Sequence, residues 1–138
     1  MARILSENCS IINLNLGSYA GSERNRLGKE GGIALAYGFG AKNCLIQFLH
    51  LRSVTMGNDE LELFAEALQD YHHLTEIDLS FNRIEGARGG AAISSIINRG
   101  MNRHGACDLE ELNLSNNKLG DLGFASIVNE LFDPNTCI

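Results

Sequence analysis

The chain has 138 residues, of which 44% are hydrophobic and 20% are charged, and its net charge is −6. These values are typical of one soluble domain that is long enough to bury a core. The sequence holds neither the roughly 18 uninterrupted apolar residues of a membrane span nor the apolar stretch of a secretory signal. We therefore expect a cytoplasmic protein that does not bind a membrane. Because acidic proteins repel phosphate backbones, we also expect no binding to nucleic acid.

One pattern recurs along the chain. Its first copy is divided between a segment at 11–19 (IINLNLGSY) and a segment at 27–39 (LGKEGGIALAYGF). The later copies are continuous and occupy 46–68, 74–97 and 109–131. Self-similarity of this kind is typical of repeat proteins, in which each copy is one structural unit.

Each copy changes its hydrophobic spacing halfway. Leu49 and Leu51 stand two residues apart, which places them on one face of a strand. Leu61, Phe64 and Leu68 follow at spacings of three and four, which predict a helix with one buried stripe. In the fourth copy, the residues predicted to form that stripe are Phe124, Ile127, Val128 and Leu131.

A strand followed by a helix, repeated, predicts an α/β fold with parallel strands in one sheet and helices covering one of its faces. No single unit buries both faces, so the units stack into a solenoid. We place the units near 9–43, 44–71, 72–106 and 107–136, within a single domain spanning 1–138.

Two units are longer than the others because they carry insertions. The copies align on equivalent apolar anchor residues, namely Ile11, Ile46, Leu74 and Leu109. The extra residues fall at 21–26 and 98–106, where loops tolerate them. The segment DPNTCI (133–138) reads as the start of a fifth unit. We therefore expect a chain truncated there, or one that self-associates through uncapped ends.

The segments LEELNLSNNKLGDLG (109–123), LTEIDLSFNRI (74–84) and LGKEGGIAL (27–35) resemble leucine-rich repeat proteins of the ribonuclease-inhibitor-like class. The resemblance covers about residues 9–138. It implies a horseshoe arc of about four repeats, with strands on the concave face and helices on the convex face. It implies a protein-binding function without naming the partner, because fold alone does not fix function.

Several residues have a structural explanation in this pattern. Asn82 and Asn117 occupy turn positions where their side chains would bond backbone groups of neighbouring units. Cys9, Cys44 and Cys107 each stand two residues before a strand's first apolar residue. Neighbouring strands lie roughly 4.8 Å apart, so these thiols cannot converge within about 2.3 Å of one zinc ion. We interpret the three cysteines as buried packing residues.

Glycines stand at the predicted helix starts, at 31–32 and in 86–90. We expect them to allow close packing of these helices against the sheet. The sequence holds no phosphate-binding loop, nucleophile motif or zinc-protease motif. We therefore expect no enzymatic activity, no cofactor and no metal.

The residues that alternate with the buried ones along each strand predict the partner-binding surface, because they face the open side of the sheet. The candidates are Asn15, Phe48, His50, Arg52, Glu76, Asp78, Glu111 and Asn113. Phe48 beside His50 and Arg52 has the chemistry of a binding hot spot, unless Phe48 and Arg52 only cover each other. Parallel strands align equivalent positions, so we expect Phe48 to neighbour Glu76. By the same rule, His50 should neighbour Asp78.

The leading interpretation is a non-enzymatic module that binds an unidentified protein through the concave strand face. Rival contact sites are the basic residues of the two insertions, namely Arg24, Arg26, Arg99, Arg103 and His104. One alternative is a regulator of a small GTPase of the activating type, in which Arg26 or Arg83 would stabilise charge in the partner's site. Another is a fragment of a larger repeat protein.

Overall fold

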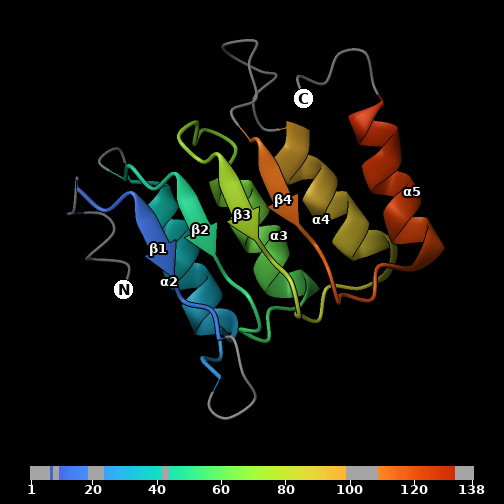
Figure 1. The fold of residues 1–138 in the computed structure, drawn as a ribbon, viewed down its shortest axis with the longest axis horizontal. Helices are drawn as coiled ribbons and strands as arrows, with labels where there is room; N and C mark the ends of the chain where they lie inside the picture. The colour runs from blue at the N-terminus through green and yellow to red at the C-terminus, as the bar shows by residue number, and fades with distance from the viewer. Residues whose placement is uncertain (1–6, 8–9, 19–23, 42–43, 99–108, 133–138) are drawn as a thin grey trace.

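The structure is a computed structural model that describes residue 7 and residues 10–18, 24–41, 44–98 and 109–132. Strands and helices alternate along the chain (Figure 1). Their order is β1 (Asn13–Asn15), α2 (Lys29–Phe39), β2 (Phe48–His50), α3 (Asn58–Ala67), β3 (Glu76–Asp78), α4 (Gly86–Asn98), β4 (Glu111–Asn113) and α5 (Gly120–Leu131). This confirms the predicted α/β solenoid of about four strand–helix units.

The strands form one parallel sheet in chain order, β1-β2-β3-β4. The register pairs Phe48 with Glu76 and Glu76 with Glu111. It also pairs His50 with Asp78. Both neighbour pairs expected from strand alternation are therefore confirmed at the level of the backbone.

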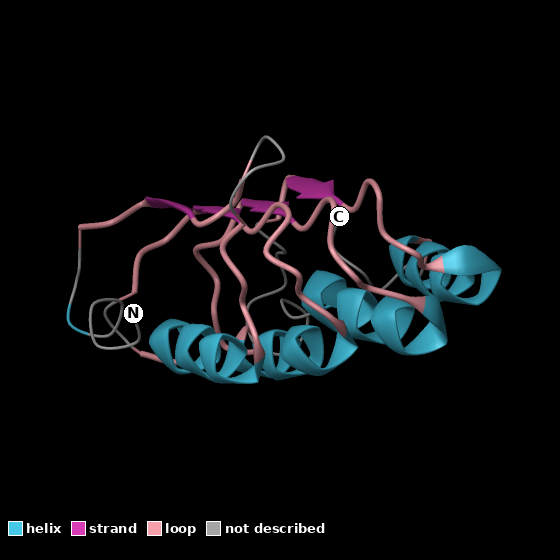
Figure 2. Cartoon of the chain, turned by 90° about the horizontal axis from the view of Figure 1, so that it is seen from below, coloured by secondary structure: helices cyan, strands magenta, loops and turns pink. Residues whose placement is uncertain are grey.

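The sheet and the helices form two layers, with α2 to α5 all on one side of the sheet (Figure 2). Leu49 and Ile77, the middle residues of β2 and β3, are fully buried between the layers. The apolar stripe of α3 meets them, and its Phe64 packs edge-on against Phe39 of α2 with ring centroids 5.4 Å apart. The two hydrophobic spacings in the sequence thus mark the two sides of one core. Among the described residues, no helix has the length and apolar character needed to cross a membrane.

Two asparagines, the buried Asn82 after β3 and the half-buried Asn117 after β4, join successive units. Asn82 accepts a hydrogen bond from the Met56 amide at 3.0 Å through Oδ1 and donates to the Leu51 carbonyl at 2.8 Å through Nδ2. Asn117 repeats the arrangement one unit later, and its Oδ1 accepts from the Ile84 amide at 3.1 Å. Both side chains thus bond backbone groups of the preceding unit.

Cys44 is the one predicted packing cysteine that lies within the described residues. Its thiol is free and belongs to the hydrophobic core. The other two cysteines of the predicted set, Cys9 and Cys107, lie outside the described residues.

Gly32 and Gly90 allow close packing of helices, but the prediction that the glycines at the helix starts pack against the sheet was wrong. A Cβ atom on Gly86 would meet nothing within 4 Å. A Cβ atom on Gly90 of α4 would overlap the backbone of Gly123 in α5, and a Cβ on Gly123 would overlap the carbonyl of Gly86. Gly32 of α2 similarly lies against Glu60 of α3. The helices α2, α3 and α4 are each flanked by the helix of the next unit, and the tightest approach is between α4 and α5.

The predicted buried stripe of the last helix is only partly correct. Ile127 is buried and Val128 is half-buried. Phe124 is 63% exposed and Leu131 is also exposed. The reason is that α5 meets α4 through Gly123 and reaches the core with Ile127, whereas no described element covers its outer side.

Candidate functional site

We call the side of the sheet turned away from the helices the open sheet face. Each strand contributes the two side chains that flank its inward-facing middle residue. The first positions hold Asn13, Phe48, Glu76 and Glu111, and the second positions hold Asn15, His50, Asp78 and Asn113. With Arg52 just after β2, the structure brings all the predicted binding residues to this face.

Three of the predicted binding residues also have a structural task at the ends of their strands. In each, the side-chain Oδ1 accepts a hydrogen bond from the amide two residues later, which is an Asx turn. The pairs are Asn15 with Gly17 at 2.9 Å, Asp78 with Ser80 at 2.9 Å and Asn113 with Ser115 at 3.1 Å. These three positions are therefore explained by the fold itself.

The corresponding residue of β2 is His50, and its side chain has a different contact. Its Nδ1 lies 3.6 Å from Oε1 of Glu76, and both side chains are partly exposed. The carboxylate beside the imidazole is thus that of Glu76, although the backbone neighbour of His50 is Asp78. The short Asp78 side chain is held by the Ser80 amide, whereas the longer Glu76 reaches His50 diagonally.

Arg52 is held at the end of β2 by residues of the next unit. Its guanidinium carbon lies 4.0 Å from the centre of the Phe81 ring, a cation–π contact. Its Nη1 donates a hydrogen bond to Oγ of Ser80 at 3.1 Å, and Ser80 is fully buried. The guanidinium of Arg52 therefore lies on the Phe81 ring.

Phe81 adopts a backbone conformation that aromatic residues rarely use. Its φ is +57°, and the residues at the same turn in the neighbouring units, Ser53 and Asn116, have φ values of +60° and +58°. Asparagine tolerates this left-handed region, whereas a bulky residue is strained there. Phe81 is also 41% exposed. Strand alternation did not reveal this residue because it lies in a turn, but a phenylalanine directly before Asn82 was a usable signal.

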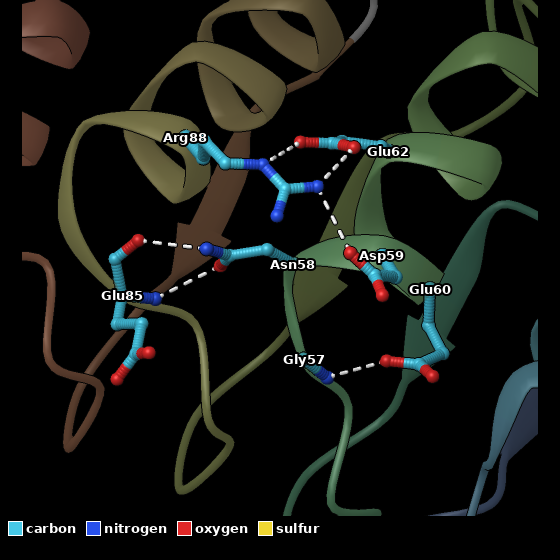
Figure 3. Close-up of polar contacts among 7 residues, drawn as sticks. All are labelled: Gly57, Asn58, Asp59, Glu60, Glu62, Glu85 and Arg88. Carbon is cyan, nitrogen blue, oxygen red and sulfur yellow. Dashed lines mark hydrogen bonds and ion pairs between the residues drawn. The ribbon is translucent and has the colours of Figure 1, made fainter.

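On the helix side, polar groups of neighbouring units form hydrogen bonds and ion pairs with one another (Figure 3). Arg88 of α4 donates from Nε and Nη2 to the Glu62 carboxylate at 2.9 and 2.7 Å, and from Nη2 to Asp59 at 2.9 Å. The hydrogen bonds to Glu62 contribute most to raising the pKa of Arg88, and the hydrogen bond to Asp59 contributes next. Asn58 and the backbone of Glu85 exchange two further hydrogen bonds of 3.0 Å each. The sequence pattern did not predict this network, which holds two units together.

The rival sites are only partly within the described residues. Arg24 and Arg26 are exposed between β1 and α2, and Arg83 is exposed between β3 and α4. Residues 21–23 and 99–106 of the insertions, with Arg99, Arg103 and His104, lie outside the described residues. A binding or GTPase-regulating role for these arginines stays a prediction.

Known proteins share this repeat. A family model described as Leucine Rich repeat matches residues 72–94 and 105–128. The whole chain aligns at 31% identity over 147 residues with "NACHT, LRR and PYD domains-containing protein 12" of Mus musculus. The chain spans 13% of the length of that relative. The similarity is to leucine-rich repeats in general, so the ribonuclease-inhibitor-like class stays a prediction.

Proposed function

We propose that this chain, a leucine-rich repeat protein, is an interaction module that binds another protein through the open sheet face around β2 and β3. The observation that carries the proposal is the chemistry of β2. The other three strands place an asparagine or aspartate at their second open position, where it forms an Asx turn. In β2 this position is His50, between Phe48 and Arg52.

This combination of side chains suits a protein partner. Aromatic and arginine side chains are enriched among the residues that contribute most to protein–protein binding. Arg52 is already held against Phe81 and Ser80, so less side-chain entropy is lost when a partner binds. The strained turn at Phe81 supports the same reading, because backbone strain is concentrated at functional sites.

The length of the mouse relative supports a broader form of the proposal. The chain corresponds to 13% of that protein, whose name includes LRR beside two other domains. In this form, the open sheet face acts as one part of a longer array, and the partner also contacts repeats that are not in this chain. The residues assigned to the surface are the same in both forms.

Affinity capture from a cell lysate, with mass spectrometry of the retained proteins, tests the proposal. The test variant is Phe48→Asn combined with Arg52→Ser. These replacements are the residues that equivalent positions of other units already carry, Asn13 and Ser80. They therefore suit the strand, and folding of the variant is verified by circular dichroism.

A matched control makes the same chemical changes on the helix side. Tyr37→Asn combined with Lys29→Ser removes one aromatic ring and one positive charge from the exposed side of α2. We expect a protein that the wild type and the control retain and the test variant loses. Equal retention by all three chains would show that the open sheet face is not the binding surface.

A further inference from the structure

We infer that the partner presents a basic side chain, an arginine or a lysine, to a row formed by Phe48, Glu76 and Glu111. This inference rests on the proposed function and adds the chemistry of the partner. The three residues are consecutive partners in the register of β2, β3 and β4. Neighbouring strands are about 4.8 Å apart, so the row presents one aromatic ring and two carboxylates side by side.

The two carboxylates of the row are unfavourable for the free protein. Like charges directly opposite one another on neighbouring strands are destabilising. Glu76 has His50 at 3.6 Å as its neighbour. Glu111 is exposed, and within the described part of the chain its carboxylate has no hydrogen bond or ion pair. A positive charge above Glu76, the middle residue of the row, would be attracted to both carboxylates and offset the repulsion between them.

The ring at the end of the row favours the same ligand. Phe48 is half-buried, so part of its ring surface remains accessible on the open sheet face. A guanidinium or ammonium group is attracted to the face of an aromatic ring and to a carboxylate at once. A cation on this row would contact Phe48 and Glu76 together, which neither an apolar nor an acidic side chain can do favourably.

The charge of the open sheet face also changes sign along the direction of the strands, and this asymmetry would orient the partner. The acidic row lies at the beginning of the strands, whereas Arg52 follows the end of β2 and is stacked on Phe81. We therefore expect the basic side chain of the partner over the row and a carboxylate or carbonyl nearer to Arg52. Such an arrangement fixes the direction in which a partner segment crosses the sheet.

A titration followed by nuclear magnetic resonance tests this inference with a defined probe. The probe is a short peptide of alternating arginine and glycine, and its charge-reversed control is the same peptide with glutamate in place of arginine. We expect saturable shifts of the amide signals of Phe48, Glu76 and Glu111 with the arginine peptide only. Glu76→Gln and Glu111→Gln should each weaken the binding by roughly three- to fivefold, as partly exposed ion pairs do.

The helix side supplies the control variant, because α3 is also acidic. Glu66→Gln removes one negative charge from the exposed side of α3 and should leave the affinity unchanged. The inference is overturned if Glu66→Gln weakens binding as much as Glu111→Gln does, or if no saturable shift occurs in the row.

The capture experiment separates failure of this inference from failure of the proposed function. If the captured protein still depends on Phe48 and Arg52 while the peptide ignores the row, the open sheet face binds a partner of different chemistry. If the captured protein also ignores Phe48 and Arg52, the binding surface itself is wrong.

Discussion

The two faces of this molecule differ in the surroundings of one charged side chain each, Arg88 on the helix side and Glu111 on the open sheet face. On the helix side, Arg88 is bonded to Glu62 and Asp59 of the preceding unit, so each charge meets its opposite. On the open sheet face, Glu76 stands beside Glu111. Rules for local stability are broken mainly at functional sites. The paired charges therefore mark the helix side as the stabilising face, and the like-charged neighbours mark the open sheet face as the surface for recognition.

The contact between α4 and α5 should give the largest effect on stability. Gly90→Ala places a Cβ atom into the backbone of Gly123, which cannot move aside as a side chain can. We expect a loss of about 3 kcal/mol in the free energy of unfolding. Chemical denaturation measures it, with Gly40→Ala as the control, since Gly40 has a right-handed conformation and room for a Cβ. Equal losses for both variants would contradict the close helix contact.

The asparagines between units should have the next largest effect. Asn82→Ala leaves the Met56 amide and the Leu51 carbonyl without their partner in a buried site, so we expect a loss of about 2 kcal/mol. Asn117 is less buried, and its replacement should destabilise by about 1 kcal/mol. Thermal unfolding measures the two variants, and Asn129→Ala on the exposed side of α5 serves as the control. A larger loss for replacement of Asn117 than for Asn82→Ala would contradict the view that burial of these hydrogen bonds determines their contribution.

Phe81→Asn sharpens the comparison between the faces, because stability and binding should respond differently. Asparagine is the residue that the next unit carries at the same turn, as Asn116, and it tolerates a positive φ. Relief of strain should offset the lost cation–π contact with Arg52, so we expect stability within about 0.5 kcal/mol of the wild type. Partner retention should nevertheless fall. A variant that loses stability strongly and binds normally would make Phe81 a structural residue.

Replacing Arg88 should have the smallest effect. Arg88→Gln removes ion pairs that are largely exposed to solvent, and such pairs contribute little. We expect a slight decrease in the unfolding temperature at low salt that disappears at high salt, where screening weakens these pairs. Arg83→Gln, in an exposed turn, is the control for loss of a positive charge. A decrease that persists at high salt would mean that Arg88 contributes by packing.

The alternation of strands and helices could be predicted from the sequence because one buried stripe leaves a periodic signal. The register could be predicted from the same signal, because Phe48 and Glu76 occupy equivalent positions in their units. It did not reveal that Phe124 is exposed. Periodicity shows which side of a helix is apolar, but it does not show whether another element covers that side.

The candidate surface was predictable only as a set of positions. Strand alternation identified the side chains that share the open sheet face, including Phe48 and His50. It did not predict the contact of His50 with Glu76, because diagonal contacts depend on side-chain length. It also missed Phe81, since the left-handed conformation of a turn has no periodic signature.

Photochemical crosslinking tests the assignment of binding to the open sheet face most directly. A photoreactive benzoylphenylalanine is placed in the chain at the position of Phe48 or, in a second sample, at that of Tyr37 on the exposed side of α2. Both samples are irradiated in the lysate, and crosslinked proteins are identified by mass spectrometry. We expect one discrete adduct from the Phe48 position and none from the Tyr37 position. An adduct from the Tyr37 position alone would contradict the assignment and move the binding surface to the helices.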